Sequence, residues 1–185
     1  MANDCNNRVK ITGKKENLEK LYERFQMDEI KEKNALFTSS YGIMFESSKE
    51  VEEWGSKWQT FNDISFDGQS TISINGDSAW GPATGFWQKI SEDFDVNIEV
   101  EYSEPGCNLG GEIAYESGEE TKNEETTYWD FIYEKENDYF WEEILNRSEY
   151  SSLEEITEEL GELYSSLSDE EKSRINQIHE ENYQE

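Results

Sequence analysis

The strongest constraint on how this chain can fold is its negative charge. Its 185 residues include 44 Asp and Glu but only 16 Lys and Arg, which gives a formal net charge of −28. Self-repulsion at this level opposes a compact state and is typical of disordered chains when apolar residues are scarce. This chain, however, carries six Trp, ten Tyr and nine Phe, with only two prolines. Because each buried aromatic ring removes a large apolar area from water, the sequence predicts a folded, very acidic and soluble protein.

The charge also limits the partners of the protein. An acidic surface repels nucleic-acid phosphates and anionic membranes, so we expect no direct binding to either and a positively charged protein partner instead. No apolar run approaches the roughly 18 residues of a membrane helix, and the N-terminus lacks the regions of a signal peptide. The sequence therefore predicts a cytoplasmic protein. There, Cys5 and Cys107 are expected to be buried thiols rather than a disulfide or a nucleophile.

The charge is unevenly distributed along the chain. Residues 119–185 hold 22 acidic and five basic residues, whereas residues 1–118 hold 22 acidic and 11 basic residues. We predict a mixed α+β domain over residues 1–118, with an insert at about 27–60. Residues 119–185 are predicted to be an acidic, aromatic-rich and mostly helical C-terminal extension.

Two periodicities define the elements of the first part. Alternating apolar residues predict short strands at 7–12, 61–66, 71–74, 96–102 and 112–115. Helical spacing predicts helices at 17–25 and from Pro82 to Phe94. Asp67-Gly68 indicates a hairpin, and Asn75-Gly76-Asp77 is read as a polar turn. This order predicts a split β-α-β arrangement, an antiparallel sheet with two helices on one face. The insert has apolar residues that suggest a further strand, at Leu36, Phe37, Tyr41, Ile43 and Phe45.

The C-terminal extension is predicted to be helical after a short aromatic segment. Residues 128–133 are rich in aromatics and favour a strand, and an aromatic helix follows through Leu145. Apolar residues then trace one stripe of a single helix, at positions 153, 156, 160, 163 and 167. Two pairs have the spacing of capping boxes, Ser152 with Glu155 and Ser168 with Glu171. The second pair predicts a corner between two helices directly after Leu167.

Four short motifs stand in order along the first part. They are Cys5-Asn6-Asn7-Arg8-Val9-Lys10-Ile11-Thr12-Gly13, Trp54-Gly55-Ser56-Lys57-Trp58, Ser78-Ala79-Trp80-Gly81-Pro82 and Tyr102-Ser103-Glu104-Pro105-Gly106. Together they resemble motifs of a ferredoxin-like family that phages and plasmids carry, known from its YubB-type members. The resemblance covers about residues 4–118, with Gly81-Pro82 standing where the family has Pro-Pro. It implies a ferredoxin-like fold and an origin on a mobile element of a bacterial host, but no general biochemical activity.

The residues give little support to catalysis. The one histidine, His179, is expected to be solvated on a polar helix, with no nucleophile near it in sequence. One His and two separated Cys do not suggest a zinc site. Asp93 and Asp95 form a DxD pair without an EF-hand loop, and the loop from Gly106 to Gly111 is read as a tight turn. We therefore expect no catalytic residue, no metal and no cofactor, and a metal-dependent hydrolase is the third hypothesis.

The tryptophans of the family motifs allow two interpretations. Trp54, Trp58 and Trp80 could line a ligand pocket with Lys57 as a polar anchor. They could instead close the open face of a small sheet as core residues, and this is the favoured interpretation. The pocket supports the second hypothesis, a ferredoxin-like module that binds a small ligand or a peptide.

The acidic helix from Ser152 carries the first hypothesis. It holds rows of glutamates at Glu154, Glu155, Glu158, Glu159 and Glu162. Like charges four residues apart destabilise a helix by roughly 0.2–0.5 kcal/mol per pair, and few basic residues are near in sequence to offset them. Either the rows are a solvated face, or they imitate phosphate spacing for a basic groove. The first hypothesis is thus a non-enzymatic counter-defence protein that binds the nucleic-acid groove of a host nuclease, such as an RNA-guided CRISPR-Cas effector. Aromatic anchors are expected at Trp129, Trp141 and Tyr150.

Overall fold

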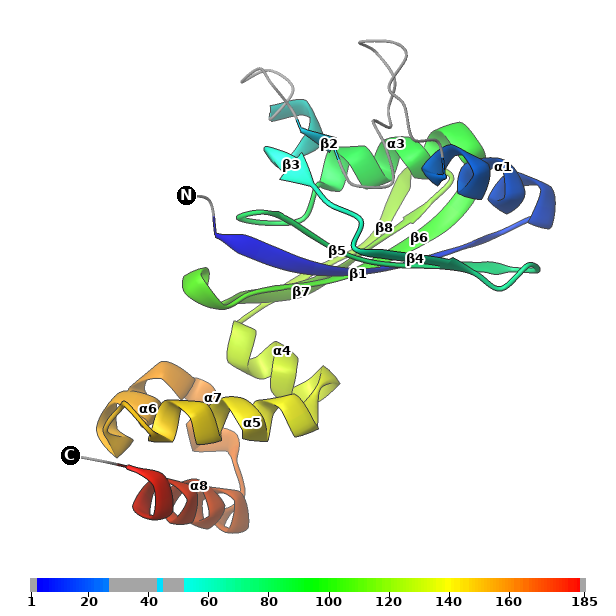
Figure 1. Cartoon of the computed structure of the whole chain (residues 1–185). Coiled ribbons are helices and arrows are strands. Elements are labelled where there is room, and N and C mark those ends of the chain that lie inside the picture. The colour runs from blue at the N-terminus through cyan, green and yellow to red at the C-terminus, as the bar shows by residue number, and fades with distance from the viewer. Residues whose placement is uncertain (1–2, 27–42, 45–51, 184–185) are drawn as a thin grey trace. The chain divides into compact units, whose positions relative to one another are not determined.

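The computed structural model in Figure 1 describes residues 3–26, 43–44 and 52–183. The chain divides into two compact units, residues 1–126 and residues 127–185. Most of the predicted insert lies outside the described residues, including Leu36, Phe37, Tyr41 and Phe45. Within the described ranges, no helix is both long enough and apolar enough to cross a bilayer.

The first unit is built on one antiparallel sheet. Its central strand β1 (Asp4–Gly13) lies between β5 (Thr71–Ala79) and β6 (Val96–Glu104). The other strands are β2 (Ile43–Met44), β3 (Trp58–Gln59), β4 (Asp63–Phe66), β7 (Leu109–Glu116) and β8 (Glu119–Thr126). The order across the sheet is β2-β3-β5-β1-β6-β7-β8, and β4 also pairs with β5. The two units β1-α1-β4 and β5-α3-β6 interleave, so the predicted split β-α-β, ferredoxin-like fold is confirmed.

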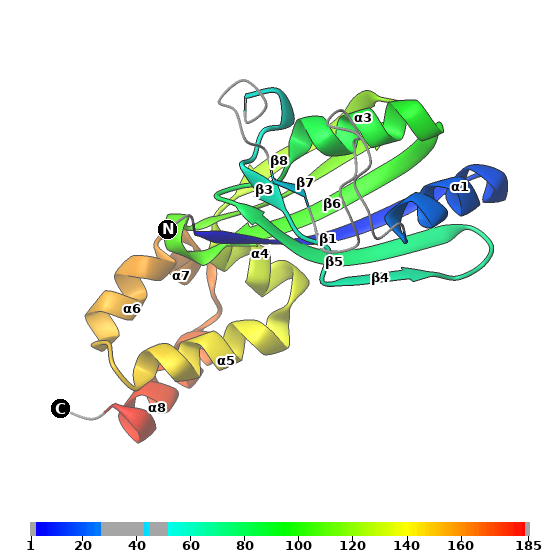
Figure 2. The same ribbon diagram turned by 45° about the horizontal axis from the view of Figure 1, so that its top comes forward.

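Two helices cover one face of this sheet, as Figures 1 and 2 show. They are α1 (Lys15–Phe25) and α3 (Thr84–Phe94). Strand β1 turns Cys5, Asn7, Val9 and Ile11 toward the core and leaves the residues between them exposed. The helices supply the other half of the core with Leu18, Leu21, Phe25, Phe86, Trp87 and Ile90. The alternating pattern in the sequence therefore corresponds to the sheet, and the helical spacing corresponds to the layer of helices on it.

The β4–β5 hairpin forms as predicted at Asp67. Its carboxylate accepts hydrogen bonds from the backbone N–H groups of Gln69, Ser70 and Thr71, at 2.7, 2.8 and 3.1 Å. These three bonds hold the pKa of Asp67 below its usual value. The loop closes with Gly68 at a φ of 75°.

The polar turn predicted at Asn75-Gly76-Asp77 is wrong. These residues continue β5, and each pairs with a residue of β1. The backbone of Thr60 passes so close that a Cβ on Gly76 would lie 2.0 Å from the Thr60 carbonyl oxygen. Glycine is therefore required here by the close approach of the segment between β3 and β4 rather than by a bend.

The boundary between the two parts also lies further along the chain than predicted. Residues 119–126 form strand β8, which pairs with β7, and the second unit begins at Thr127 rather than at 119. Nearly all side chains of β8 are exposed, so it shows no apolar alternation that could have identified it. Its charges are typical of an edge strand that must not pair with another chain.

The second unit is entirely helical within the described residues. Its helices are α4 (Tyr128–Lys135), α5 (Asn137–Ser148), α6 (Leu153–Leu160), α7 (Glu162–Ser166) and α8 (Asp169–Asn182). The strand predicted at 128–133 is wrong, because Thr127 caps a helix there by accepting a hydrogen bond from the Asp130 N–H at 3.1 Å. The aromatic residues of α4 and α5 pack into a separate core with Ile156, Leu160 and Ile175.

The predicted stripe is buried, but the single helix that should carry it is broken. Ile156, Leu160, Leu163 and Leu167 are all buried. Gly161 separates α6 from α7 with φ 54° and ψ −123°, a conformation that is essentially restricted to glycine. Both predicted capping boxes are confirmed, at Ser152 with Glu155 and at Ser168 with Glu171. The second one begins α8 directly after Leu167.

Candidate functional site

Three of the four motifs meet through buried polar contacts between β1, β5 and the segment before β3. The side-chain amide of Asn7 donates to Ser78 Oγ at 2.7 Å, and the Ser78 hydroxyl donates to the Gly81 carbonyl at 2.7 Å. Ser56 Oγ accepts from the Ala79 N–H at 3.0 Å. Asn7, Ser56 and Ser78 are essentially inaccessible to solvent. Buried polar groups must be paired, so this network explains why these residue types occur together in the motifs.

Trp80 emerges from this network onto the surface. Its side chain is 49% exposed, and its φ of 63° is in the left-handed region. Its backbone N–H is held by the carbonyl of Asn3 at 2.9 Å. The predicted core role of Trp80 is therefore wrong. A bulky residue in this conformation is strained, and its neighbours impose the geometry.

The fourth motif forms a short turn that is capped by a buried glutamate. Glu104 is 1% exposed, and its carboxylate accepts the N–H groups of Gly106 and Cys107 in the turn η1 (Pro105–Cys107). The turn ends at Asn108, so the loop predicted to reach Gly111 is shorter, and Leu109 already starts β7.

The two cysteines lie in different environments. Cys5 is buried as predicted, and desolvation raises its pKa to about 12. Cys107 is exposed, so the expectation that both thiols are buried is wrong for it. Its hydrogen bond to Glu104 raises the pKa of the Cys107 thiol.

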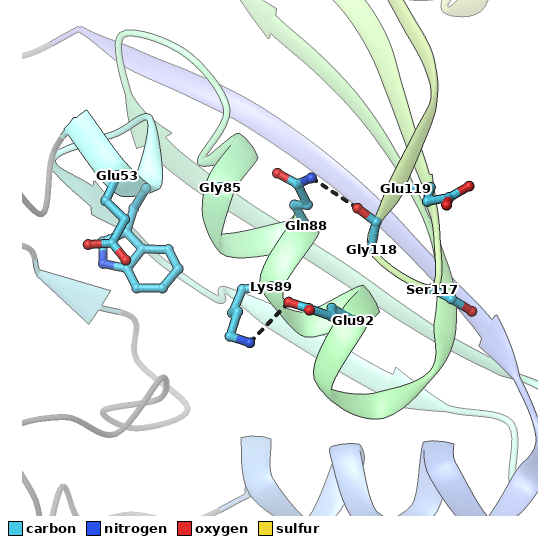
Figure 3. A pocket seen from close by; sticks show the side chains of 9 residues that line it. Glu53, Gly85, Gln88, Lys89, Glu92, Ser117, Gly118 and Glu119 are labelled. Carbon is cyan, nitrogen blue, oxygen red and sulfur yellow. Dashed lines mark hydrogen bonds and ion pairs between the residues drawn. The ribbon is translucent and has the colours of Figure 1, made fainter.

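A hollow of about 500 Å³ lies on the surface of the first unit. As Figure 3 shows, α3 forms its floor, with the segment at Glu53 on one side and the β7–β8 turn on the other. The described residues that line it are Glu53, Trp54, Gly85, Gln88, Lys89, Glu92, Ser117, Gly118 and Glu119.

Only one of the four predicted pocket residues lines this hollow. Trp54 does so, half-buried and packed against the core. Trp58 is in β3 and Lys57 is exposed, and neither they nor Trp80 are among the described residues that line this hollow, so this hollow is not the predicted pocket. The amino group at the hollow belongs to Lys89 instead.

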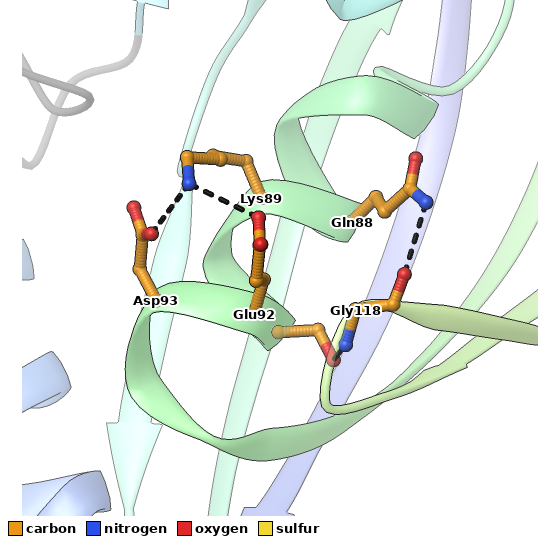
Figure 4. A network of polar contacts seen from close by, with 6 residues as sticks. Gln88, Lys89, Glu92, Asp93 and Gly118 are labelled. Atoms are coloured by element: carbon orange, nitrogen blue, oxygen red, sulfur yellow. Dashed lines mark hydrogen bonds and ion pairs between the residues drawn. The ribbon is translucent and has the colours of Figure 1, made fainter.

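Polar contacts fix the floor and the turn of the hollow, as Figure 4 shows. Gln88 Nε2 donates to the Gly118 carbonyl at 2.9 Å, and the Gly118 N–H donates to Ser91 Oγ at 3.0 Å. Lys89 Nζ lies 2.6 Å from Asp93 Oδ1 and 3.0 Å from Glu92 Oε2. The hydrogen bond to Asp93, followed by that to Glu92, raises the pKa of Lys89.

Sequence reasoning did not identify this grouping. The signal for the turn was Ser117-Gly118, whose φ values of 49° and 87° are those of a two-residue hairpin turn. The alternating pattern of the preceding strand ended near this turn. The strand that follows is polar and shows no alternation, so the sequence did not indicate the second strand of the hairpin. Lys89 and Glu92 had the appearance of an ordinary charged helix face.

The residues considered for catalysis have structural partners. Asp93 pairs with Lys89, and Asp95 bonds to Ser117 at 2.8 Å and to Lys14 at 3.4 Å. Among the described residues, no three His, Cys, Asp or Glu side chains gather as a metal site would require. His179 is half-buried rather than solvated, because its ring stacks on Tyr183 and its Nε2 lies 3.2 Å from the Ser151 carbonyl oxygen.

The five predicted partner-binding glutamates are exposed but do not act alike. Glu155 belongs to the capping box, where the Ser152 backbone N–H and hydroxyl keep its pKa below the usual value. Glu159 faces Arg147 at 3.4 Å. Glu154 and Glu158 remain on α6, whereas Glu162 starts α7 beyond Gly161, so the continuous row predicted through Glu162 is wrong.

The three predicted aromatic anchors differ in how far they are exposed to solvent. Trp129 is 4% exposed and belongs to the core, so its predicted role as an exposed anchor is wrong. Trp141 is half-buried, with the Arg174 guanidinium carbon 3.9 Å from its ring centroid. Tyr150 is 85% exposed, as an anchor requires.

Comparisons with known proteins bear on the first unit and the start of the second. A search of curated proteins gives no match. The crystal structure of protein Api92 from Yersinia pseudotuberculosis resembles this chain with a TM-score of 0.50 at 10% sequence identity. The match covers 69% of this chain and 98% of that one, and at such low identity it shows the fold alone.

The family comparison is more direct. A model described as the ferredoxin-like domain in Api92-like protein matches residues 53–146, just over half of the chain. The matched region starts later than the resemblance noted in the sequence and extends through α4 into α5. It contains all residues that line the hollow. The chain therefore belongs to the family of ferredoxin-like domains of Api92-like proteins.

Proposed function

We propose that this protein is a non-enzymatic binding protein whose acidic second unit docks on a basic surface of a partner protein. The observation that carries the proposal is the charge of that unit. Residues 127–185 hold 18 acidic residues and four basic ones. Arg147 pairs with Glu159, Arg174 lies over Trp141, and Lys172 donates to the Ser165 carbonyl, so these basic groups are engaged within the unit. Most of the negative charge is thus left for an external partner or for solvent.

The distribution of the charge supports a docking role. Glu154, Glu158 and Glu162 are exposed, and Tyr150 adds an exposed aromatic ring just after the end of α5. Charge of one sign steers association with an oppositely charged surface, and the aromatic ring supplies contact area once the surfaces meet. Because the Debye length is about 10 Å at 0.1 M salt, this steering should be strongly salt-dependent.

The partner class follows from the same chemistry. Basic surfaces large enough to match this charge are those that hold nucleic acid, so we infer a nucleic-acid-binding groove. An RNA-guided CRISPR-Cas nuclease is the partner that we would test first. In this proposal the protein is encoded by a phage or plasmid, acts in the cytoplasm of a bacterial host and blocks the nuclease.

The test compares two variants that lose the same charge. In the first, Glu154, Glu158 and Glu162 are replaced by Gln, which leaves the capping box and the Arg147 pair intact. In the control, the exposed Glu16, Glu23 and Glu116 of the first unit are replaced by Gln. Glutamine keeps the shape and helix propensity of glutamate, so both variants should fold.

The measurements are the association rate with a purified RNA-guided nuclease at stepped salt concentrations, and target-DNA cleavage by that nuclease. We expect the first variant to associate more slowly, with a flatter salt dependence and weaker inhibition, and the control to behave like the parent. Equal inhibition by the parent and the first variant would show that these glutamates do not bind the partner. Cleavage or modification of nucleic acid by this protein itself would contradict the non-enzymatic role.

A further inference from the structure

The hollow on α3 has the rigidity of a prepared site. Its floor is a regular helix, and its rim turn is tied to that helix by the bonds of Gly118 to Gln88 and Ser91. Trp54, on the opposite side, packs against the core cluster. A site built on such elements loses little conformational entropy when a ligand enters. Its volume of about 500 Å³ is within the range of small-molecule sites, roughly 300–1,000 Å³.

The charged residues around the hollow determine whether a ligand should be an anion or a cation. Among the described residues that line the hollow, the carboxylates of Glu53, Glu92 and Glu119 stand against the single ammonium of Lys89. That ammonium is already held by two carboxylates, Glu92 and Asp93. In the part of the chain that the structure describes, neither Glu53 nor Glu119 has an ion-pair partner. An anion would therefore be repelled, and a cation would gain partners.

The aromatic wall selects the kind of cation. An indole attracts organic cations to its ring face, and a planar guanidinium can stack on it while donating to carboxylates. Elsewhere in the chain, the Arg174 guanidinium lies over the ring of Trp141 in this way. At the hollow, the indole of Trp54 and the carboxylates of Glu53 and Glu119 line the same space.

We propose that this hollow binds an organic cation, above all the guanidinium of an arginine. Trp54 would contact the flat face of the cation, and Glu53 and Glu119 would accept its hydrogen bonds from the two sides. The site belongs to the ferredoxin-like unit and does not depend on the acidic docking that we propose for the second unit. The cation can come from a free small molecule or from an arginine side chain of a peptide.

The test is a titration of the whole protein, followed by NMR at the indole N–H of Trp54, with N-acetyl-arginine amide as the probe. N-acetyl-citrulline amide is the matched neutral ligand, because its ureido group has nearly the same shape without the charge. We expect saturable shifts of the Trp54 signal with the arginine compound only. A Gly-Gly-Arg-Gly-Gly peptide distinguishes the sources: binding equal to that of the arginine compound indicates a side chain, and weaker binding indicates a free cation.

Three variants locate the binding. Glu119→Gln removes an exposed charge of the rim and should weaken binding about two- to fivefold, the effect of one modest ionic contact. Trp54→Leu should weaken it by a similar factor, since a cation–π contact at an exposed site has a similar strength. Glu23→Gln, on α1 outside the hollow, is the control for net charge and should have no effect. The backbone NMR spectrum of each variant will show whether that variant is folded.

Three results would overturn the proposal. The first is equal binding of the citrulline and arginine compounds, which would show that the hollow does not recognise the charge of the ligand. The second is equal weakening by Glu119→Gln and Glu23→Gln, which would show general attraction to an acidic protein. The third is the absence of any saturable shift at Trp54. If Trp54→Leu fails to fold, the comparison of Glu119→Gln with Glu23→Gln still decides.

Discussion

The strained backbone of Trp80 predicts an unusual order of stability between two substitutions. At ordinary positions inside a strand or helix, glycine is less stable than alanine by roughly 0.5–1 kcal/mol, because glycine loses more backbone freedom on folding. Trp80 has a φ of 63°, where any side chain costs about 1–2 kcal/mol and glycine costs almost nothing. Trp80→Gly should therefore be more stable than Trp80→Ala, by about 0.5–1 kcal/mol once the two effects are combined.

Both variants should be less stable than the parent, but by less than a buried tryptophan would predict. Removing a buried Trp costs about 3–5 kcal/mol. Trp80 is 49% exposed, so its replacement by alanine removes only about half of that burial, or about 2 kcal/mol. The glycine variant should lose about 1–1.5 kcal/mol, because the relief of strain offsets part of the lost contact.

The assay is urea unfolding followed by circular dichroism, with the second unit unchanged in every variant. Ser73 provides the control, because it is exposed in the middle of β5 and has no positive φ. There the normal order should hold, with Ser73→Ala more stable than Ser73→Gly. If Trp80→Ala proves more stable than Trp80→Gly, the left-handed backbone of Trp80 is not a source of strain. A loss of the full 3–5 kcal/mol would show that Trp80 is a core residue after all.

The cysteines provide two further predictions. A thiol reagent should label Cys107 in the native protein and Cys5 only on unfolding, and equal labelling rates would contradict the burial of Cys5. Stability should also fall as the pH rises from about 9 to about 12, because burial raises the pKa of Cys5 from 9.0 to about 12, so the unfolded chain releases this proton first. Tyr102 and Tyr115, whose pKa values burial also raises to about 12, act in the same direction. Urea unfolding at stepped pH should show a smaller fall in Cys5→Ala than in the parent.

The sequence by itself was sufficient for several features that short-range interactions determine. Alternation in β1 and helical spacing in α1 and α3 identified the two layers, because each pattern follows from the geometry of its own element. Both capping boxes and the Asp67 hairpin were predicted for the same reason, since their hydrogen bonds join residues two to four positions apart. The order of these elements then indicated the split β-α-β arrangement.

Tertiary structure decided the features that depend on distant residues. Strand β8 is polar on both faces and exists because β7 offers it an edge, so its own residues gave no signal. Gly76 remains within β5 because Thr60 passes over it, and the aromatic run after Thr127 becomes helical because a separate core buries one side of it. The hollow joins three segments, at Glu53, at Lys89 and at Gly118, that only the packing of α3 between its neighbours brings together. A sequence pattern reports the surroundings of a residue along the chain, whereas a binding site depends on surroundings in space.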